Sequence, residues 1–197
     1  MVKYSAANLI DEELTFIGAS DFVSKMVYKM TKSSTISLKI EVPLSLYLRA
    51  EVLCEDIMEL SELPFCQKDL MNLLYNDFLL HAKKKPEPMA IFTLLNQLEK
   101  EIGRASTLQL QSDTNTFKRI QRKKPEQMKF LNCSMRRKFV LRGEVMLADM
   151  EEVQEGHGFT LERVLELLYM DFIEKFRRGS TKDSIENILY LLEEDLH

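Results

Sequence analysis

Two short segments, residues 45–50 and 138–143, have small or apolar residues at every second position, and all but one of the positions between these carry hydrogen-bonding side chains. Matching positions of the two segments hold Ser45, Tyr47, Arg49, Lys138, Val140 and Arg142. Arg and Lys can donate to guanine O6 and N7, Ser and Tyr hydroxyls can bond base edges, and Val can contact the thymine methyl group. This combination of residue types favours a surface that reads the bases of double-stranded DNA.

A simpler interpretation of these segments stays open at this point. Polar residues alternate with apolar ones on any half-exposed strand. In that case Arg49 and Arg142 would form ion pairs with Glu51 and Glu144, two positions along the same strand face. We favour the base-reading interpretation, because the same pattern occurs twice.

Basic clusters add candidates for contacts with phosphate. The sequence has 27 Lys and Arg residues against 31 Asp and Glu, a net charge of −4, so positive charge is local rather than general. Two such clusters are Arg136 with Arg137 and Lys123 with Lys124. Such runs are also typical of solvated linkers and helix ends, but their recurrence favours a binding face.

Motifs typical of enzymes and of metal sites are missing from the sequence. It has no glycine-rich phosphate loop and no HExxH motif, and it contains only 6 glycines. Its 3 cysteines lack the paired short spacing of a zinc site. We therefore expect a protein that is not an enzyme, binds no cofactor or metal, and keeps its thiols reduced.

Two sequence patterns recur at a nearly constant distance, which indicates an internal duplication. Leu48–Val52 matches Leu141–Val145 at an offset of 93 residues, and Leu73–Phe78 matches Leu167–Phe172 at an offset of 94. The change in offset places a one-residue insertion between the two patterns.

Each copy is expected to contain a short strand followed by helices. Apolar residues alternate from Ile36 to Leu48, which is the period of a β-strand. Pro43 cannot donate to a β-ladder and divides this run, so we predict the repeated strands at residues 45–50 and 138–143. The part before Pro43 has a weaker echo in Leu131–Met135. Helical spacing after each predicted strand indicates two helices joined by a turn, then a third helix.

The sequence divides into four segments. Residues 1–34 form an N-terminal helical arm, 35–102 the first repeat, 103–127 a polar and basic linker, and 128–197 the second repeat. The predicted fold class is mainly α-helical with a short β-ribbon. No apolar stretch reaches the length of a membrane span, so we expect a cytoplasmic, nucleoid-associated protein without a membrane partner.

The order strand, helix, turn, helix resembles the ribbon-helix-helix family of the methionine-repressor and Arc-repressor type. In the second copy Lys138–Arg142 looks like the family's ribbon, Glu144–Val153 like its first helix, and Gly158–Thr160 like its glycine turn and hydroxyl cap. The resemblance implies two antiparallel strands in the major groove and a phosphate held at the start of each second helix. The residues at those helix starts are Cys66, Gln67, Thr160 and Leu161.

We therefore predict that the protein binds double-stranded DNA sequence-specifically, as a transcriptional regulator or as a plasmid or phage accessory factor. The tandem copy supplies a pairing partner within one chain, and a ribbon formed between two chains of a homo-oligomer is the other possibility. The alternative function is a protein-interaction module that keeps this scaffold and has lost DNA binding, in line with the net charge of −4.

Overall fold

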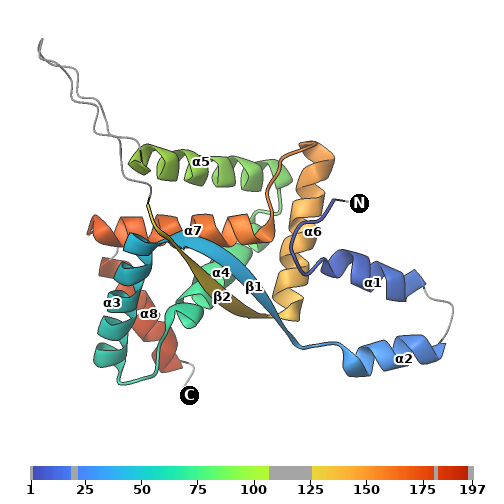
Figure 1. Ribbon diagram of the computed structural model, residues 1–197, viewed down its shortest axis with the longest axis horizontal. Helices are drawn as coiled ribbons and strands as arrows, with labels where there is room; N and C mark the ends of the chain where they lie inside the picture. The colour runs from blue at the N-terminus through green and yellow to red at the C-terminus, as the bar shows by residue number, and fades with distance from the viewer. Residues whose placement is uncertain (1, 19–21, 107–125, 180–181, 195–197) are drawn as a thin grey trace, which may run out of the picture.

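The computed structural model describes residues 2–18, 22–106, 126–179 and 182–194 of the chain (Figure 1). This part of the chain is mainly helical and contains a two-stranded antiparallel sheet, which agrees with the predicted mixture of helices and a short ribbon. No helix within the described ranges is both long and apolar enough to cross a membrane.

The elements follow one another in an order that repeats after the first two helices. They are α1 (Leu9–Gly18), α2 (Phe22–Thr31), β1 (Thr35–Pro43), α3 (Leu44–Ser61), α4 (Gln67–Lys84), α5 (Pro88–Ser106), β2 (Met128–Arg136), α6 (Arg137–Val153), α7 (Leu161–Arg177) and α8 (Lys182–Glu194). Because α5 continues to Ser106, residues 103–106 of the predicted linker are helical, and residues 107–125 lie outside the described ranges.

The two strands pair along their whole length and bury one face of the ribbon. Thr35 pairs with Arg136 at one end, and Lys39 pairs with Asn132 in the middle. Alternate residues of a strand point to opposite faces. The residues that point into the core, all buried, are Leu38, Ile40, Val42, Leu131, Cys133 and Met135.

The strands lie one segment earlier in the sequence than we predicted. Residues 45–50 and 138–143 are not extended, because they form the first turns of α3 and α6. The last residues before these helices are Pro43, with φ −57° and ψ 133°, and Arg136, with φ −62° and ψ 130°. The prediction of strands at Ser45–Ala50 and Lys138–Gly143 is therefore wrong.

The apolar pattern explains this error. Leu46 and Leu48 continue the alternation of the strand past Pro43, but only Leu46 is buried, while Leu48 is 56% exposed. The spacing that decides the structure is helical, since the buried residues of α3 include Leu46, Ala50 and Leu53. The leucines of the first turns of α3 lie in phase with the apolar positions of β1. Over these few residues, the beginning of a helix therefore looks like a continuation of the strand.

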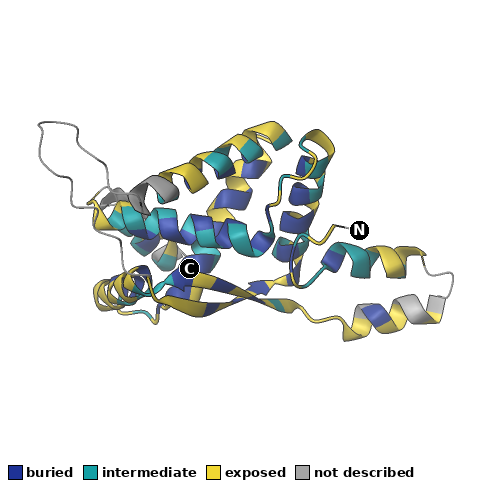
Figure 2. Cartoon of the chain, turned by 45° about the horizontal axis from the view of Figure 1, so that its top comes forward, coloured by how far each residue is buried: buried dark blue, intermediate teal, exposed yellow. Residues whose placement is uncertain are grey.

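The halves of the chain interlock around one core. Helix α4 packs on β2 and α7 packs on β1, so each strand is covered by the second helix of the other half. Helix α5 packs against α6 and α7, and α8 packs against α3. Figure 2 shows the ribbon along one side of the molecule, with exposed residues on its outer face and helices on its inner face.

Two buried tyrosines tie the halves together by hydrogen bonds. The Tyr75 hydroxyl of α4 donates to the Phe139 carbonyl oxygen of α6 at 3.0 Å. The Tyr169 hydroxyl of α7 donates to Gln67 Oε1 of α4 at 2.5 Å. Burial raises the pKa of both tyrosines, so both hydroxyls stay protonated and act as donors.

The N-terminal helices are anchored on the start of α6. Glu144 is buried and accepts hydrogen bonds from Ser5 Oγ at 2.5 Å and from the backbone N–H of Ile10 at 2.8 Å. Arg137 is also buried, and its guanidinium contacts Glu13 Oε1 at 3.1 Å and the Tyr28 hydroxyl at 2.6 Å. These contacts hold α1 and α2 beside the end of the ribbon (Figure 1).

Candidate functional site

The outer face of the ribbon is open to solvent, and we call it the ribbon face. It consists of the alternate residues from Thr35 to Glu41 and from Phe130 to Arg136. These side chains, all exposed, belong to Thr35, Ser37, Lys39, Glu41, Phe130, Asn132, Ser134 and Arg136. These residues are polar apart from the Phe130 ring, and beyond them the same face ends in the apolar pair Pro43 and Met128.

The middle of the ribbon face carries one cation and one amide. Lys39 lies opposite Asn132, and four residue pairs of the register lie on either side of them. Lys39 Nζ lies 3.7 Å from the centroid of the Phe130 ring, which is a cation–π contact. The serines Ser37 and Ser134 face each other in the next pair on this face. Hydrogen-bonding groups thus point outward from the centre of the ribbon.

Side chains from the helices hold both edges of the ribbon. Glu166 Oε1 of α7 accepts from the backbone N–H of Glu41 at 3.0 Å. Asn72 Nδ2 of α4 donates to the carbonyl oxygen of Ser134 at 3.3 Å. Such contacts satisfy backbone groups that an edge strand would otherwise leave open to pairing with another chain. They also fix the ribbon on the helices beneath it.

Positive charge is present at both ends of β2. Arg136 is exposed at one end, and its guanidinium has no hydrogen-bond or ion-pair partner among the described residues. Lys129 is exposed at the other end, but it pairs with Val42 and so lies on the inner face, where its Nζ is 5.7 Å from the centroid of the Tyr47 ring of α3. Arg136 is therefore the one of the two whose side chain points outward from the ribbon face.

The residues that we expected to read bases lie on helices rather than on the ribbon. Ser45, Tyr47 and Arg49 belong to the start of α3, where the Ser45 hydroxyl donates to Glu126 Oε1. In α6, Val140 is fully buried. Lys138 and Arg142 line a hollow between α6 and α4.

The start of α7 is already bound by the N-terminal segment. The backbone N–H of Leu161 donates to the carbonyl oxygen of Tyr4 at 2.6 Å, and Glu162 Oε1 accepts from the N–H of Ala6 at 2.7 Å. Thr160 is the helix cap, as predicted, and its hydroxyl accepts from the N–H of Arg163 at 3.3 Å. The expected phosphate contacts at Thr160 and Leu161 are therefore replaced by contacts within the chain.

The start of α4 is likewise bound within the chain. Asp69 Oδ2 accepts from the N–H of Cys66 at 2.9 Å, which places a carboxylate where the phosphate was expected. Gln67 is buried, and its Nε2 donates to Glu51 Oε1 and to the Tyr47 carbonyl oxygen. The Cys66 N–H and the Gln67 side chain are therefore engaged by groups of this chain.

The basic residues that we expected to contact phosphate differ in their exposure. Arg136 is exposed on the ribbon face, whereas Arg137 is buried against the N-terminal helices, with Glu12 Oε2 at 2.8 Å from its guanidinium. An internal ion pair of this kind leaves Arg137 unavailable to an external phosphate. Lys123 and Lys124 lie outside the described residues.

The two cysteine thiols in the core are not nucleophiles near neutral pH. Cys54 and Cys133 are buried, and burial raises the pKa of each to about 12. Both are therefore protonated near neutral pH and pack as small apolar side chains. The third cysteine, Cys66, is exposed and free.

Sequence reasoning missed the residues that form the ribbon face. The strict alternation of Ile36, Leu38, Ile40 and Val42 was the available signal, together with its echo in Leu131–Met135. Residues between buried positions of a strand point outward. That rule would have identified Ser37, Lys39, Glu41, Phe130, Asn132 and Ser134.

Comparison of the chain with protein-family models, with curated proteins and with solved structures found no match.

Proposed function

We propose that this protein binds double-stranded DNA sequence-specifically by inserting the ribbon face into the major groove. The proposed architecture resembles that of the ribbon-helix-helix family, with both units of the usual dimer within one chain. The single observation that carries the proposal is a two-stranded ribbon whose polar outer face is exposed while helices cover its other face.

The spacing of the elements supports a pseudo-dimer within one chain. Strands β1 and β2 begin 93 residues apart, as do α3 and α6. Helices α4 and α7 begin 94 residues apart, as do α5 and α8. These are the two offsets of the repeated sequence patterns, so we infer that one strand–helix–helix–helix unit was duplicated.

The register of the ribbon supports the same inference. Lys39 and Asn132, which pair in the middle of the ribbon, are 93 residues apart in the sequence. Equivalent residues of the two copies therefore face each other at the centre, as they would across the two-fold axis of a symmetric dimer. An axis at this point brings matching side chains of both copies to the same groove.

The residue types of the ribbon face suit base reading. A two-stranded ribbon fits the major groove, which is about 12 Å wide. Lys39 can donate to guanine, Asn132 can form two hydrogen bonds with adenine, and Glu41 can accept from the cytosine amino group. The Phe130 ring can contact a thymine methyl group. Because the equivalent positions carry different residues, we expect an operator whose two half-sites differ.

One end of β2 supplies a contact with the DNA backbone. Arg136 lies at the end of the ribbon face, is exposed and can reach a phosphate beside the groove. Such a contact positions a protein without reading sequence.

A protein-interaction module is the second candidate function. The acidic balance of the whole chain, with a net charge of −4, favours it. So does Glu41 on the ribbon face, because an uncompensated carboxylate is repelled by the charge of DNA. In this case the ribbon face would contact a polar protein surface.

Selection of bound duplexes from random DNA, followed by a salt titration, separates the two functions. For a DNA-binding protein we expect enrichment of a defined site and an affinity that falls steeply between about 50 and 200 mM salt through counterion release. No enrichment and no complex at the lower salt concentration would reject the DNA proposal in favour of the interaction module.

A further inference from the structure

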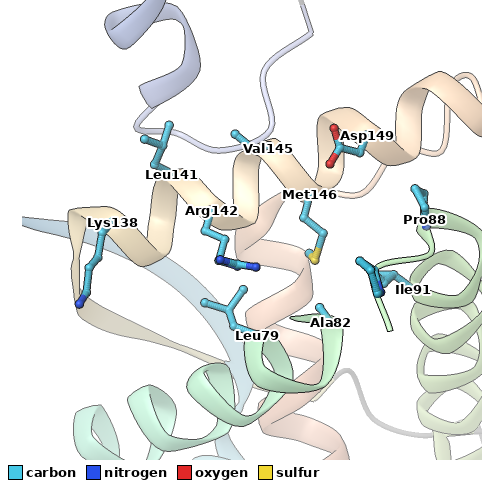
Figure 3. A pocket seen from close by; sticks show the side chains of 11 residues that line it. Leu79, Ala82, Pro88, Ile91, Lys138, Leu141, Arg142, Val145, Met146 and Asp149 are labelled. Carbon is cyan, nitrogen blue, oxygen red and sulfur yellow. The ribbon is translucent and has the colours of Figure 1, made fainter. Parts of the chain in front are cut away.

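A hollow of about 470 Å³ opens between α4, α5 and α6 (Figure 3). Leu79 and Ala82 of α4 line it from one side, and Ile91 lines it from α5. Met146 lines it from α6. Its volume lies within the range of small-molecule sites, about 300–1,000 Å³.

The hollow also has a cationic group, the guanidinium of Arg142. Arg142 points from α6 toward Leu79 in Figure 3, and its guanidinium has no hydrogen bond or ion pair among the described residues. Lys138 lines the hollow one helical turn earlier, where its Nζ also lies 4.9 Å from the centroid of the Phe139 ring. Asp149 lines the far end. A cation at one end and apolar walls define an amphipathic site.

The other half of the chain differs at the position that makes room for this hollow. Ala82 corresponds to Phe176 at the offset of 94 residues that relates α4 to α7. Arg142, by contrast, corresponds to Arg49 at the offset of 93 that relates α6 to α3. The arginine is therefore common to both halves, and the small residue is particular to one of them.

We propose that this hollow binds a small anionic amphiphile, namely a carboxylate with an apolar body. The carboxylate accepts hydrogen bonds from the Arg142 guanidinium, which presents several donors in a fixed plane. The apolar body lies against Leu79, Ile91 and Met146. Binding there removes apolar surface from water and pairs the carboxylate with a cation that has no hydrogen bond or ion pair in the described part of the chain.

Isothermal titration calorimetry with octanoate tests the head group. Octanamide has the same chain without the charge, and octylammonium reverses the charge. We expect octanoate to bind with one site per chain, and octanamide and octylammonium to bind about tenfold or more weakly, because hydrogen bonds to a charged group are the stronger ones. Absence of octanoate binding, or equal binding of the three compounds, would overturn the proposal.

Matched variants locate the site. Arg142→Ala should weaken octanoate binding about tenfold or more, while Arg49→Ala, its counterpart in α3, should leave it unchanged. Ala82→Phe should abolish binding by filling the hollow. Far-UV circular dichroism checks the fold of each variant, and if Ala82→Phe does not fold, the arginine pair decides alone. Equal losses in Arg142→Ala and Arg49→Ala would refute binding at this hollow.

Discussion

At the scale of single residues, the contact between Tyr75 and Gly143 explains how closely α4 approaches α6. A Cβ atom on Gly143 would lie 2.1 Å from the Tyr75 hydroxyl and 2.9 Å from Leu161 Cδ1. Glycine is needed here because the hydroxyl must reach the carbonyl oxygen of Phe139. The equivalent position of α3 is Ala50, which is itself fully buried.

Gly143→Ala should lower the free energy of unfolding by about 1–3 kcal/mol, because overpacking exceeds the gain in helix propensity. Adding Tyr75→Phe should restore part of this loss, since it removes the atom closest to the new methyl group. Urea denaturation of both variants measures the effect. A Gly143→Ala protein as stable as the wild type would show that α4 and α6 do not approach so closely.

Gln67 is the second residue on which the contact between the halves depends. It accepts from the Tyr169 hydroxyl and donates to Glu51. Gln67→Ala should cost about 1–3 kcal/mol of unfolding free energy, because it leaves buried polar groups unpaired. Gln97→Ala is the control, because Gln97 is exposed on α5 and its Nε2 donates to Glu101, one helical turn later. Equal stability of both variants in urea would contradict this role.

At the scale of elements, the N-terminal helices are held by a cluster of charges. The Tyr28 hydroxyl donates to Glu13 Oε1 at 2.9 Å, and Lys32 Nζ lies 3.3 Å from the same oxygen. Burial, and then the hydrogen bond to Glu13, raise the pKa of Tyr28 to about 12. Together with Arg137, these groups dock α1 and α2 on α6.

The docking of this arm should depend on pH through Glu13. Burial alone would raise the pKa of Glu13, but hydrogen bonds from Tyr28, Lys32 and Arg137 outweigh it and lower the pKa below 4.5. A lowered pKa in the folded state means that docking is fully stabilised above pH 4.5 and weakens as the pH falls through the lowered value.

We expect NMR resonances of α1 and α2 to shift toward those of a released arm in acid. Glu13→Gln should remove most of this pH dependence, while Glu59→Gln on the exposed surface of α3 should not. Resonances of the arm that respond to acid in the same way in Glu13→Gln as in the wild type would exclude Glu13 as the origin.

Helices and strands differed in how well they could be predicted from sequence. The amphipathic spacing around Leu73–Phe78 and Leu167–Phe172 identified α4 and α7, because a buried helical stripe is a local signal. The strands were placed one segment late, because the stronger sequence repeat lies in the helices that follow them. The contacts that occupy the starts of α4 and α7 join residues far apart in sequence, such as Tyr4 and Leu161, and no local pattern predicts them.

At the scale of the whole molecule, the two halves are mutually dependent. Each strand pairs with the strand of the other half, and α4 and α7 each cover the strand of the other half. A single strand with one apolar face has no partner for its edges and cannot bury its helices alone. The ribbon therefore forms within one chain, without need of a second copy.

A fragment of residues 126–197 should not fold as a monomer. It would expose Leu131, Cys133 and Met135, which are buried in the whole chain. We expect either an unfolded monomer or a dimer in which two copies of β2 pair around Asn132. Circular dichroism measures the helix content of the fragment, and light scattering during size-exclusion chromatography measures its mass. Together they distinguish these states. A folded monomeric fragment would disprove the interdependence of the halves.

The most direct test of the central claim is the affinity of ribbon-face variants for a selected duplex. Lys39→Ala and Asn132→Ala should each weaken binding by about 1–3 kcal/mol and relax selectivity at the base pairs that they contact. Lys100→Ala is the charge-matched control, because Lys100 is exposed on α5, which α7 separates from the ribbon (Figure 1). Its affinity should stay close to that of the wild type. Ribbon-face variants that bind the duplex as tightly and as selectively as Lys100→Ala would contradict DNA reading by the ribbon.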